Sequence, residues 1–389
     1  MKKRGLLLIM FLIIIGAQGC ELPQSYPIEE IQNILVVGID IEDEDIIFTV
    51  VVDTLTKGGK PGEEQTGTKI YTATGRTIAE AKRNLHRYIE KRLSLYHLAY
   101  IIIGQKAAEQ EMAKSLNYFL EIDESSLLIK LFVTKEMTAQ EFIEKTNEEK
   151  ANLADNLTSL IEETIRTAKA SKVILLDYAI KHERAWEDFY IPTIQKYSNP
   201  LKESIGDEKK QGPSYKLEGS AIFKDDKLNQ YLNGDSARGL NFLLDEVKST
   251  VITIKDVNDK YVSFETIDSK TKIVPKVKNT SLSATVEVDV KSNFLEYYEK
   301  KDMLTEKYLN DLKQKHSEVI KKEIEQALFL LQKEETDVIG MGDAFFHKDP
   351  KKWRDINANW QDIFSTLNIT VKVNVYIQGS YYLDNALGQ

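Results

Sequence analysis

Hydrophobic residues alternate with polar residues in several short stretches of the chain, and in other stretches they recur every three or four residues. The first pattern predicts strands and the second predicts helices. Residues 34–39 and 46–52 are rich in β-branched side chains and flank the acidic run 42–45, which predicts two strands joined by a solvated turn. Further strands are predicted at 100–103 and 127–133.

Two capping boxes mark the start of helices in the same half of the chain. Thr77 and Glu80 form the first box, and the apolar residues that follow at helical spacing predict a helix from about 77 to 95. Thr138 and Glu141 form the second box and predict the start of another helix. Helices are also predicted over residues 106–119 and 153–168.

The second half of the chain continues this mixture. The run 224–227 (KDDK) separates two short strand patterns, which is typical of a hairpin. Helices are predicted over 236–247 and 349–367, and strands over 215–223, 228–232, 251–254, 261–267, 281–290 and 369–377. From about 301 to 334, apolar residues keep helical spacing without Gly or Pro, which predicts a rod of roughly 50 Å. This long helix either packs on a sheet or pairs with another protein.

A polar stretch at 198–214 divides the predicted elements into two groups, and its Asn-Pro and Gly-Pro pairs favour turns. The 370 residues that follow residue 19 (389 minus 19) are more than one hydrophobic core usually organises. The sequence therefore predicts a multidomain α+β fold with mixed sheets and packed helices. We expect an N-terminal α+β region at 31–197, a linker at 198–214, and a C-terminal α+β region at 215–387 that contains the long helix.

The first twenty residues are typical of a bacterial lipoprotein signal. A basic start (KKR, residues 2–4) precedes the uncharged apolar run 5–16, and small residues flank a cleavage point directly before Cys20. We expect removal of residues 1–19 and attachment of diacylglycerol to Cys20, with residues 20–30 as a short tether. Two acyl chains hold a protein on a membrane, since each buried methylene contributes roughly 0.8 kcal/mol.

Two other interpretations of this segment remain open. A transmembrane helix is one, although the apolar run is about a dozen residues and a hydrocarbon core requires roughly 20. An ordinary secretory cleavage site is the other, and it would leave Cys20 as a free thiol at the new N-terminus. The segment departs from the usual lipobox at Ala17 and Gln18, where an aliphatic residue and then Ala or Ser are usual.

The mature chain is expected to be acidic and to contain one cysteine. Removal of the signal leaves 49 Lys and Arg against 61 Asp and Glu, a net charge of −12 (49 minus 61). Nucleic acid and anionic lipid repel such a chain. No disulfide can form within it, and no polybasic stretch follows Cys20. Attachment to a membrane must therefore come from the lipid or from protein partners.

The sequence offers no convincing active site. The five histidines are scattered, and 182–186 (HERAW) places tryptophan where a zinc-binding helix requires its second histidine. Gly62 and Gly67 have the spacing of a phosphate-binding loop but lack its Lys-Ser/Thr order. Residues 340–342 (GMG) lack the third glycine of a dinucleotide-binding turn, and we interpret them as the end of a helix. We expect no catalytic residues, no metal site and no cofactor.

The predicted helix at 77–95 is basic within an acidic chain. Arg76, Lys82, Arg83, Arg87, Lys91 and Arg92 outnumber Glu80 and Glu90. One interpretation is a surface that docks to an acidic partner or to the membrane. The other is a solvated helix face held by ion pairs.

Several motifs are specific in combination. The second half of the chain contains 216–228 (KLEGSAIFKDDKL), 231–235 (YLNGD) and 237–240 (ARGL). The first half adds 37–40 (VGID), 75–81 (GRTIAEA) and 98–104, and the end adds 343–379 with Trp353 and Trp360. In this order the motifs resemble the Ger(x)C family of spore germination lipoproteins over essentially the whole mature chain. One departure is Glu21-Leu22, where family members often carry Trp-Asp after the lipid-bearing cysteine.

The resemblance implies the C subunit of a nutrient germinant receptor, anchored by Cys20 on the outer leaflet of the spore's inner membrane. It implies two integral membrane partners, the A and B subunits. These partners would mainly sense the nutrient, such as an amino acid, sugar or nucleoside, while the lipoprotein would be required for a functional complex. The family brings no catalytic residues, and its fold is α+β with several mixed domains.

Two other functions fit some of the same features. A solute-binding lipoprotein of an importer shares the anchor and the size, but it usually has two doubly wound lobes, and the regular βαβ alternation of such lobes is absent here. A cell-surface hydrolase would need a nucleophile and a base, and the sequence offers no such pair.

Overall fold

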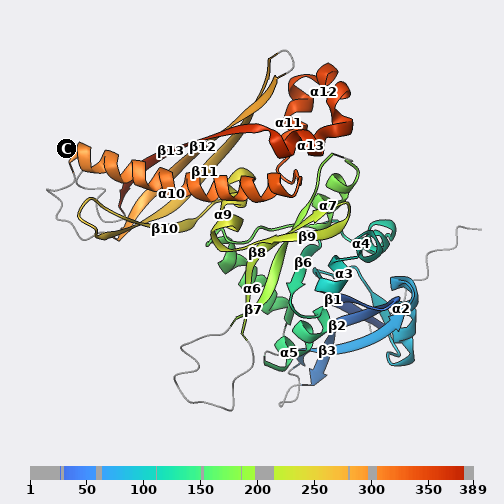
Figure 1. Ribbon diagram of the computed structural model, residues 1–389. Helices are drawn as coiled ribbons and strands as arrows, with labels where there is room; N and C mark the ends of the chain where they lie inside the picture. The colour runs from blue at the N-terminus through green and yellow to red at the C-terminus, as the bar shows by residue number, and fades with distance from the viewer. Residues whose placement is uncertain are drawn as a thin grey trace, which may run out of the picture.

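The computed structural model describes residues 27, 30–57, 64–110, 112–149, 153–184, 186–197, 214–278, 281–296 and 305–380. Within these residues the chain forms two β-sheets with packed helices (Figure 1). The larger sheet lies at the lower right of the view, and the smaller sheet lies at the upper left beside the long helix α10 (Glu306–Lys333). This mixed arrangement with a long C-terminal helix confirms the predicted fold class.

The larger sheet has nine strands in the part of the chain that the structure describes, in the order β3-β2-β1-β5-β6-β7-β8-β9, with β4 beside the start of β1. The strands are β1 (Ile31–Glu42), β2 (Asp45–Lys57), β3 (Glu64–Gly75), β4 (Arg92–Ser94), β5 (Tyr100–Ile103), β6 (Lys130–Lys135), β7 (Tyr190–Tyr197), β8 (Ser214–Lys224) and β9 (Lys227–Leu232). β1, β5, β6 and β7 run parallel, and antiparallel strands complete the sheet on both sides. β5 (YIII) is buried along its whole length, as expected for the centre of a parallel sheet.

Both predicted hairpin turns are confirmed, and aspartates occupy them. The β1–β2 turn pairs Glu42 with Asp45, and Asp43 has a positive φ of 56°. In the β8–β9 turn, Asp225 and Asp226 have φ values of 50° and 64°. Aspartate tolerates the left-handed region better than most residues because its short side chain can bond locally. The acidic residues at 42–45 therefore form the turn between β1 and β2.

The helices of the first half are α2 (Ile78–Asn84), α3 (Gln105–Ala108), α4 (Met112–Glu121), α5 (Ala139–Glu149), α6 (Leu153–Ile165) and α7 (Leu175–His182). The N-cap residues of both predicted capping boxes are confirmed, because Thr77 accepts a hydrogen bond from the Glu80 N–H (3.2 Å) and Thr138 accepts one from the Glu141 N–H (3.0 Å). The predicted helix at 77–95 is too long. It ends in a short 3₁₀ turn, η2 (Leu85–Arg87), because 92–94 pair with the first residues of β1 as β4.

Hydrophobic residues pack on both faces of the larger sheet. A bulge between Ile34 and Val36 shifts the phase of β1, so Ile34 and Val37 lie in one cluster while Val36 lies in the other. The second cluster includes Phe142 and Leu157 of α5 and α6. The first cluster is larger, and it continues without interruption into the core of the smaller sheet.

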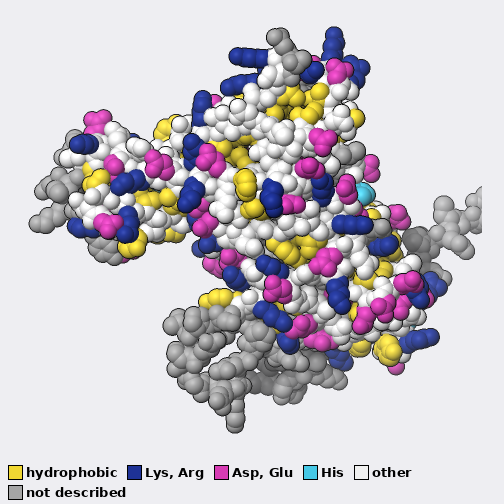
Figure 2. All heavy atoms as spheres, viewed as in Figure 1, with side chains coloured by type: hydrophobic (Ala, Val, Ile, Leu, Met, Phe, Trp, Pro, Cys, Tyr) yellow, Lys and Arg dark blue, Asp and Glu magenta, His cyan; other side chains and the backbone are white. Residues whose placement is uncertain are grey.

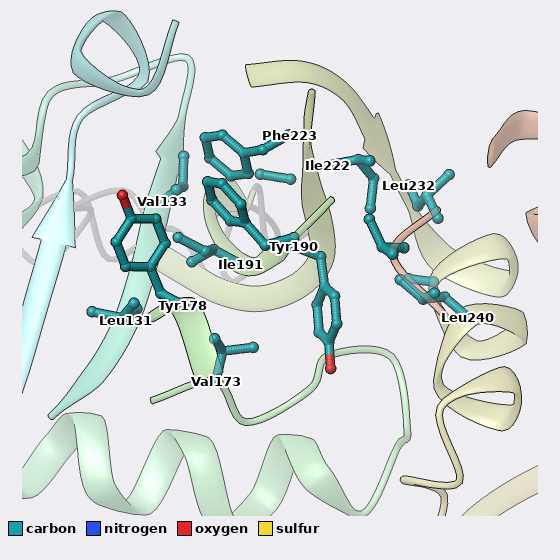
Figure 3. Packing of buried hydrophobic residues seen from close by; sticks show 14 of the residues in the cluster. Leu131, Val133, Val173, Tyr178, Tyr190, Ile191, Ile222, Phe223, Leu232 and Leu240 are labelled. Atoms are coloured by element: carbon teal, nitrogen blue, oxygen red, sulfur yellow. The ribbon is translucent and has the colours of Figure 1, made fainter. Parts of the chain in front are cut away.

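Figure 3 shows part of this shared core. Phe223 of β8 stacks on Phe189 with 4.5 Å between ring centroids. In the same view Leu232 of β9 and Leu240 of α9 (Gly234–Leu243) lie in the same part of this core. The hydrophobic contact between the two halves of the chain is therefore part of the core.

The linker predicted at 198–214 lies outside the described residues except for Ser214. The strands on its two sides are neighbours, because β7 and β8 pair antiparallel from Tyr190 with Ile222 to Tyr197 with Ser214. The larger sheet therefore continues across the predicted boundary. The regions at 31–197 and 215–387 contribute strands to one sheet.

The smaller sheet has the order β10-β11-β12-β13, formed by β10 (Thr250–Lys255), β11 (Tyr261–Lys278), β12 (Ser281–Glu296) and β13 (Asn368–Ser380). β11 is much longer than the predicted strand at 261–267, because it pairs with β12 as far as Lys278. α10 begins after Thr305, which accepts a hydrogen bond from the Tyr308 N–H (3.3 Å). Its buried residues, among them Leu312 and Ile324, belong to the shared core, so the long helix packs on a sheet.

Three short helices precede β13: α11 (Met341–Lys348), α12 (Pro350–Ile356) and α13 (Trp360–Thr366). The helix predicted at 349–367 is interrupted by the 3₁₀ turn η5 (Asn357–Asn359). The interpretation of residues 340–342 as the end of a helix is wrong. Gly340 has a φ of 70° and precedes the first residue of α11, so the glycines begin a helix.

Candidate functional site

The predicted lipidation site, Cys20, lies outside the described residues, as does most of the tether at 20–30. Lipidation therefore stays a prediction. Among the helices that the structure describes, none has the length and hydropathy of a membrane span.

The histidines do not come together in the described part of the chain. His86 and His97 are exposed, His182 stacks on Tyr178 (5.2 Å between centroids), and His347 lies 3.3 Å from Asp343. Within the same residues, no group of three or more His, Cys, Asp or Glu side chains is placed to hold a metal ion.

The motif at 37–40, Gly104 and the second capping box meet at one point. Asp40 is buried at the end of β1 and accepts hydrogen bonds from the N–H groups of Ala139 (2.8 Å) and Gln140 (2.9 Å), at the start of α5. A Cβ at Gly104 would lie 1.8 Å from Asp40 Oδ1. Burial raises the pKa of Asp40, and the two backbone hydrogen bonds oppose that rise. These residues therefore fix α5 to the edge of the sheet.

An acidic cleft of about 470 Å³ opens beside Asp40, at the carboxyl ends of the parallel strands. Its lining includes Asp40, Glu42, Glu109, Glu136 and Glu141 against a single basic residue, Lys106. Ligands of open α/β sheets bind at this edge. We name it the carboxyl-edge cleft. A second cleft lies between the β1–β2 turn, α2 and α4, where Arg76 pairs with Glu44 and Asp45.

The motif at 216–228 joins β8 to the connection between α6 and α7. Gly219 has a φ of 97°, and its N–H donates to the Lys169 carbonyl (2.8 Å). A Cβ at this position would lie 2.7 Å from the Leu232 carbonyl oxygen. Asn241 of α9 donates to the Ala168 carbonyl (2.7 Å). Glycine is required at 219 because the backbone of three segments meets there.

The motif at 237–240 joins α9 to α10. Arg238 and Glu323 form a buried ion pair through two nitrogens of the guanidinium, with 2.8 Å between Nε and Oε2. A Cβ at Gly239 would lie 2.1 Å from the Glu323 carbonyl oxygen, so only glycine lets the two helices approach this closely. Burial raises the pKa of Glu323, and Arg238 opposes that rise.

The C-terminal motif joins α11 and α13 to the larger sheet. The carboxylate of Asp337 accepts hydrogen bonds from the Met341 N–H (3.0 Å), the Gly342 N–H (2.7 Å) and Trp360 Nε1 (2.8 Å). Asp188, just before β7, accepts a hydrogen bond from the Asp337 N–H (3.0 Å). Burial raises the pKa of Asp188 to about 7 and also raises that of Asp337.

Ion pairs support this junction at its rim. Lys181 of α7 donates to the Val338 carbonyl (2.7 Å) and pairs with Glu187 (3.1 Å). Arg184 pairs with Glu187 (3.0 Å) and Asp343 (3.2 Å).

The motif residues therefore hold elements together at four junctions. Asp40 and Arg238 lie inside motifs that the sequence singles out. Asp188, Glu323 and Asp337 carry no such signal, because their patterns in the sequence resemble those of solvated acidic residues. Figure 2 shows basic and acidic side chains interspersed over the visible face, without a large area of one sign.

Two family models together match most of the chain. "Spore germination protein N-terminal domain" matches residues 24–196, and "Spore germination B3/ GerAC like, C-terminal" matches residues 218–381. The gap between the two matches falls on the predicted linker at 198–214.

Relatives match over nearly their whole length. Spore germination protein KC of Bacillus subtilis is 23% identical over 99% of this chain and 98% of its own, and spore germination protein GerQC of Bacillus cereus is 22% identical over 98% and 99%. Spore germination protein B3 of Bacillus subtilis is 22% identical over 97% and 98%. The crystal structure of the GerBC protein has the same fold, with a TM-score of 0.54, 18% identity, and coverage of 88% of this chain and 96% of that one. The chain therefore belongs to the GerAC/B3-like family of spore germination proteins, which are C subunits of germinant receptors.

Proposed function

We propose that this protein is the lipid-anchored C subunit of a spore nutrient germinant receptor. The observation that carries this proposal is the match to spore germination proteins over both halves of the chain. In this proposal Cys20 carries the lipid, the folded part stands on the outer face of the spore's inner membrane, and the A and B integral membrane subunits are its partners.

The role that fits the described structure is that of a binding and scaffold component. The buried polar residues of the motifs join α5, α10 and the helices α11–α13 to the rest of the fold, so they stabilise one arrangement of surfaces. Rigid surfaces dock with less loss of conformational freedom than flexible ones. The anchor confines the protein to a thin layer at the membrane, where weak docking contacts act at high effective concentration.

We infer that the protein carries no catalytic activity of its own. Buried acids of raised pKa, such as Asp188 and Asp337, are positioned by backbone N–H groups inside the core. A general acid or base must reach a bound substrate. Both side chains are less than 8% exposed, so they cannot reach a substrate and instead stabilise the fold.

The test is the variant Cys20→Ala in sporulating cells, with nutrient-triggered germination and membrane fractionation measured on the same spores. We expect the variant protein to leave the membrane fraction and nutrient germination to slow strongly. A matched control is Ser25→Ala, which changes the tether and keeps Cys20. Normal germination with a soluble Cys20→Ala protein would contradict the proposal.

A further inference from the structure

The starts of the parallel strands β1, β5 and β6 lie along one edge of the larger sheet, and the chain enters the sheet at this edge. Ile31, the first residue of β1, pairs with Arg92 of β4. Arg92 pairs in turn with Glu124 (3.6 Å), in the loop before β6. The Lys130 N–H donates to the Ala99 carbonyl (3.0 Å). Residues 87–99 and 124–130 therefore lie next to each other beside the entry point of the chain.

Large apolar side chains project from this surface into solvent. Tyr88 is 66% exposed, Tyr96 is 68% exposed, Leu127 is 43% exposed and Leu128 is 68% exposed. Single exposed hydrophobic residues are common on proteins and need no explanation. Four at the same edge of one sheet form an apolar group, which is typical of an interaction site. Tyrosine suits a membrane surface in particular, because its ring is apolar and its hydroxyl is polar.

Basic residues flank Tyr88 in the sequence. Arg87 and Lys91 are exposed, and among the residues that the structure describes no carboxylate lies within ion-pairing distance of either. Lys82 and Arg92 share Glu124 as their partner, at 3.5 and 3.6 Å. The acidic residues exposed nearby are Glu30, Glu90 and Asp123. Unpaired cations next to exposed apolar groups are unexpected in a protein with a net charge of −9.

We propose that this surface docks on the bilayer, with its apolar side chains among the headgroups and its cations on anionic phospholipid. We name it the amino-edge surface and define it by Arg87, Tyr88, Lys91, Tyr96, Leu127 and Leu128. The short distance along the chain from the anchor to this surface identifies the bilayer as its partner. Only nine residues separate Cys20 from Glu30, and the ten steps of extended chain between them span at most about 35 Å. The inference rests on the proposed function, because it takes Cys20 as the anchor.

Docking of this surface sets the orientation of the protein. Asp40 lies nine residues along β1 from Ile31, which is about 30 Å at the rise of a strand. The carboxyl-edge cleft beside Asp40 then faces away from the bilayer, toward the side from which a soluble molecule arrives. The basic residues at 82–92 therefore divide between the two earlier interpretations, ion pairing and docking. Lys82 is held in an ion pair, while Arg87 and Lys91 are available to lipid.

The only cysteine of the chain makes a direct test possible. The chain from Cys20 onward is coupled through its thiol to maleimide-bearing lipid in vesicles, which reproduces the anchor without cellular acylation. Hydrogen exchange of peptides covering 83–98 and 123–130 is then compared on vesicles of phosphatidylcholine with and without phosphatidylglycerol, because anionic headgroups attract basic segments. We expect slowed exchange in both peptides on the anionic vesicles only.

Variants separate the parts of the proposal. Arg87→Gln with Lys91→Gln should weaken docking by about 25-fold, at about fivefold for each basic residue, and should restore fast exchange. Leu127→Ser with Leu128→Ser should do the same by removing the apolar contact. The matched control is Lys276→Gln with Lys278→Gln, two exposed lysines of β11, which should leave the protection unchanged.

The outcomes decide the inference independently of the receptor. Exchange that stays as fast on anionic vesicles as in solution would overturn it, and so would protection that survives the Arg87 and Lys91 substitutions. Protection found only after addition of detergent-solubilised spore membrane proteins would assign the surface to an acidic protein partner and would also overturn it. Failure of the proposed function is read separately, from germination of the Cys20→Ala spores.

Discussion

Arg238 of α9 and Glu323 of α10 form an ion pair inside the protein, where the backbone of Gly239 touches the backbone of Glu323. The pair joins the helix that follows the larger sheet to the long helix of the smaller sheet. Removal of both charges from water is costly, and the double hydrogen bond offsets that cost. The helix that follows the larger sheet is therefore fixed to the long helix by a contact whose partners lie 85 residues apart.

Loss of one partner of this pair should destabilise the protein strongly. We expect Glu323→Ala to lower the free energy of unfolding by about 3–5 kcal/mol, because Arg238 is left buried without a counterion. The double variant Arg238→Met with Glu323→Leu should lose less than Glu323→Ala, since no uncompensated charge remains. Urea unfolding of the three proteins gives the comparison. A double variant that is less stable than Glu323→Ala would contradict this account of the junction.

Gly104 and Asp40 should be energetically coupled. A methyl group at 104 collides with the carboxylate that caps α5, so Gly104→Ala should cost about 1–3 kcal/mol on its own. In an Asp40→Ala background the collision is absent, and the same substitution should cost clearly less. A double-mutant cycle on unfolding free energies measures the difference, which we expect to lie at about 0.5–3 kcal/mol. Strictly additive costs would show that the contact does not matter.

Asp188 should make stability depend on pH in a defined direction. Its pKa in the folded protein is about 7, above the ordinary value for aspartate, because the carboxyl is buried. Between about pH 4 and 7 the unfolded chain releases this proton while the folded protein keeps it, so the contribution to stability falls as pH rises. Asp188→Asn removes that fall and keeps the acceptor for the Asp337 N–H.

The measurement is the unfolding free energy of wild type and Asp188→Asn at several pH values. We expect the unfolding free energy of the variant, relative to wild type, to increase by up to about 4 kcal/mol as pH rises from about 4 to 7. Above that range the difference should stay constant. A difference that is constant over the whole range would mean that the carboxyl is ionised in the folded protein.

His316 should have the opposite effect. It is fully buried, stacks on Phe264 (4.8 Å), and in the described part of the chain neither ring nitrogen has a hydrogen-bond partner. Burial, with a smaller effect from Arg238, lowers its pKa to about 4. The imidazole of His316 therefore stays neutral in the folded protein over a pH range in which it binds a proton in the unfolded chain. The stability that this neutral histidine allows is lost as pH falls from about 6.5 to 4.

The variant His316→Met should remove this dependence with little change in volume. Relative to wild type it should gain stability as pH falls below about 6.5, by up to about 3 kcal/mol near pH 4. Chemical unfolding at pH 4.5, 6 and 8 tests this, with the exposed His97→Met as the control. An unchanged gap between His316→Met and wild type at the three pH values would count against a neutral buried histidine.

Local signals predicted much of the fold. The β1–β2 and β8–β9 hairpins follow from alternating patterns around acidic turns, and the starts of α2 and α5 follow from capping boxes. The motif order also predicted the family. The hairpins and helix starts are encoded within a few neighbouring residues, and the family is encoded in the order of short motifs along the chain, which is why the sequence alone was sufficient.

Elements that depend on distant partners were not predicted. β4 has three residues and exists because it pairs with Ile31–Asn33, and β7 contains Pro192, which weakens its strand pattern. β11 continues past 267 only because β12 lies beside it. The buried acids Asp188 and Asp337 meet across 149 residues of sequence, so nothing near either one signals its burial. Cys20 stands apart, since its signal is a local motif.

Purification of the protein from spore inner membranes in mild detergent tests the central claim most directly. The account predicts that the protein, with an acylated N-terminal Cys20, is recovered together with the two integral membrane subunits of the receptor. Recovery of an unacylated protein from the soluble fraction, without those subunits, would contradict it.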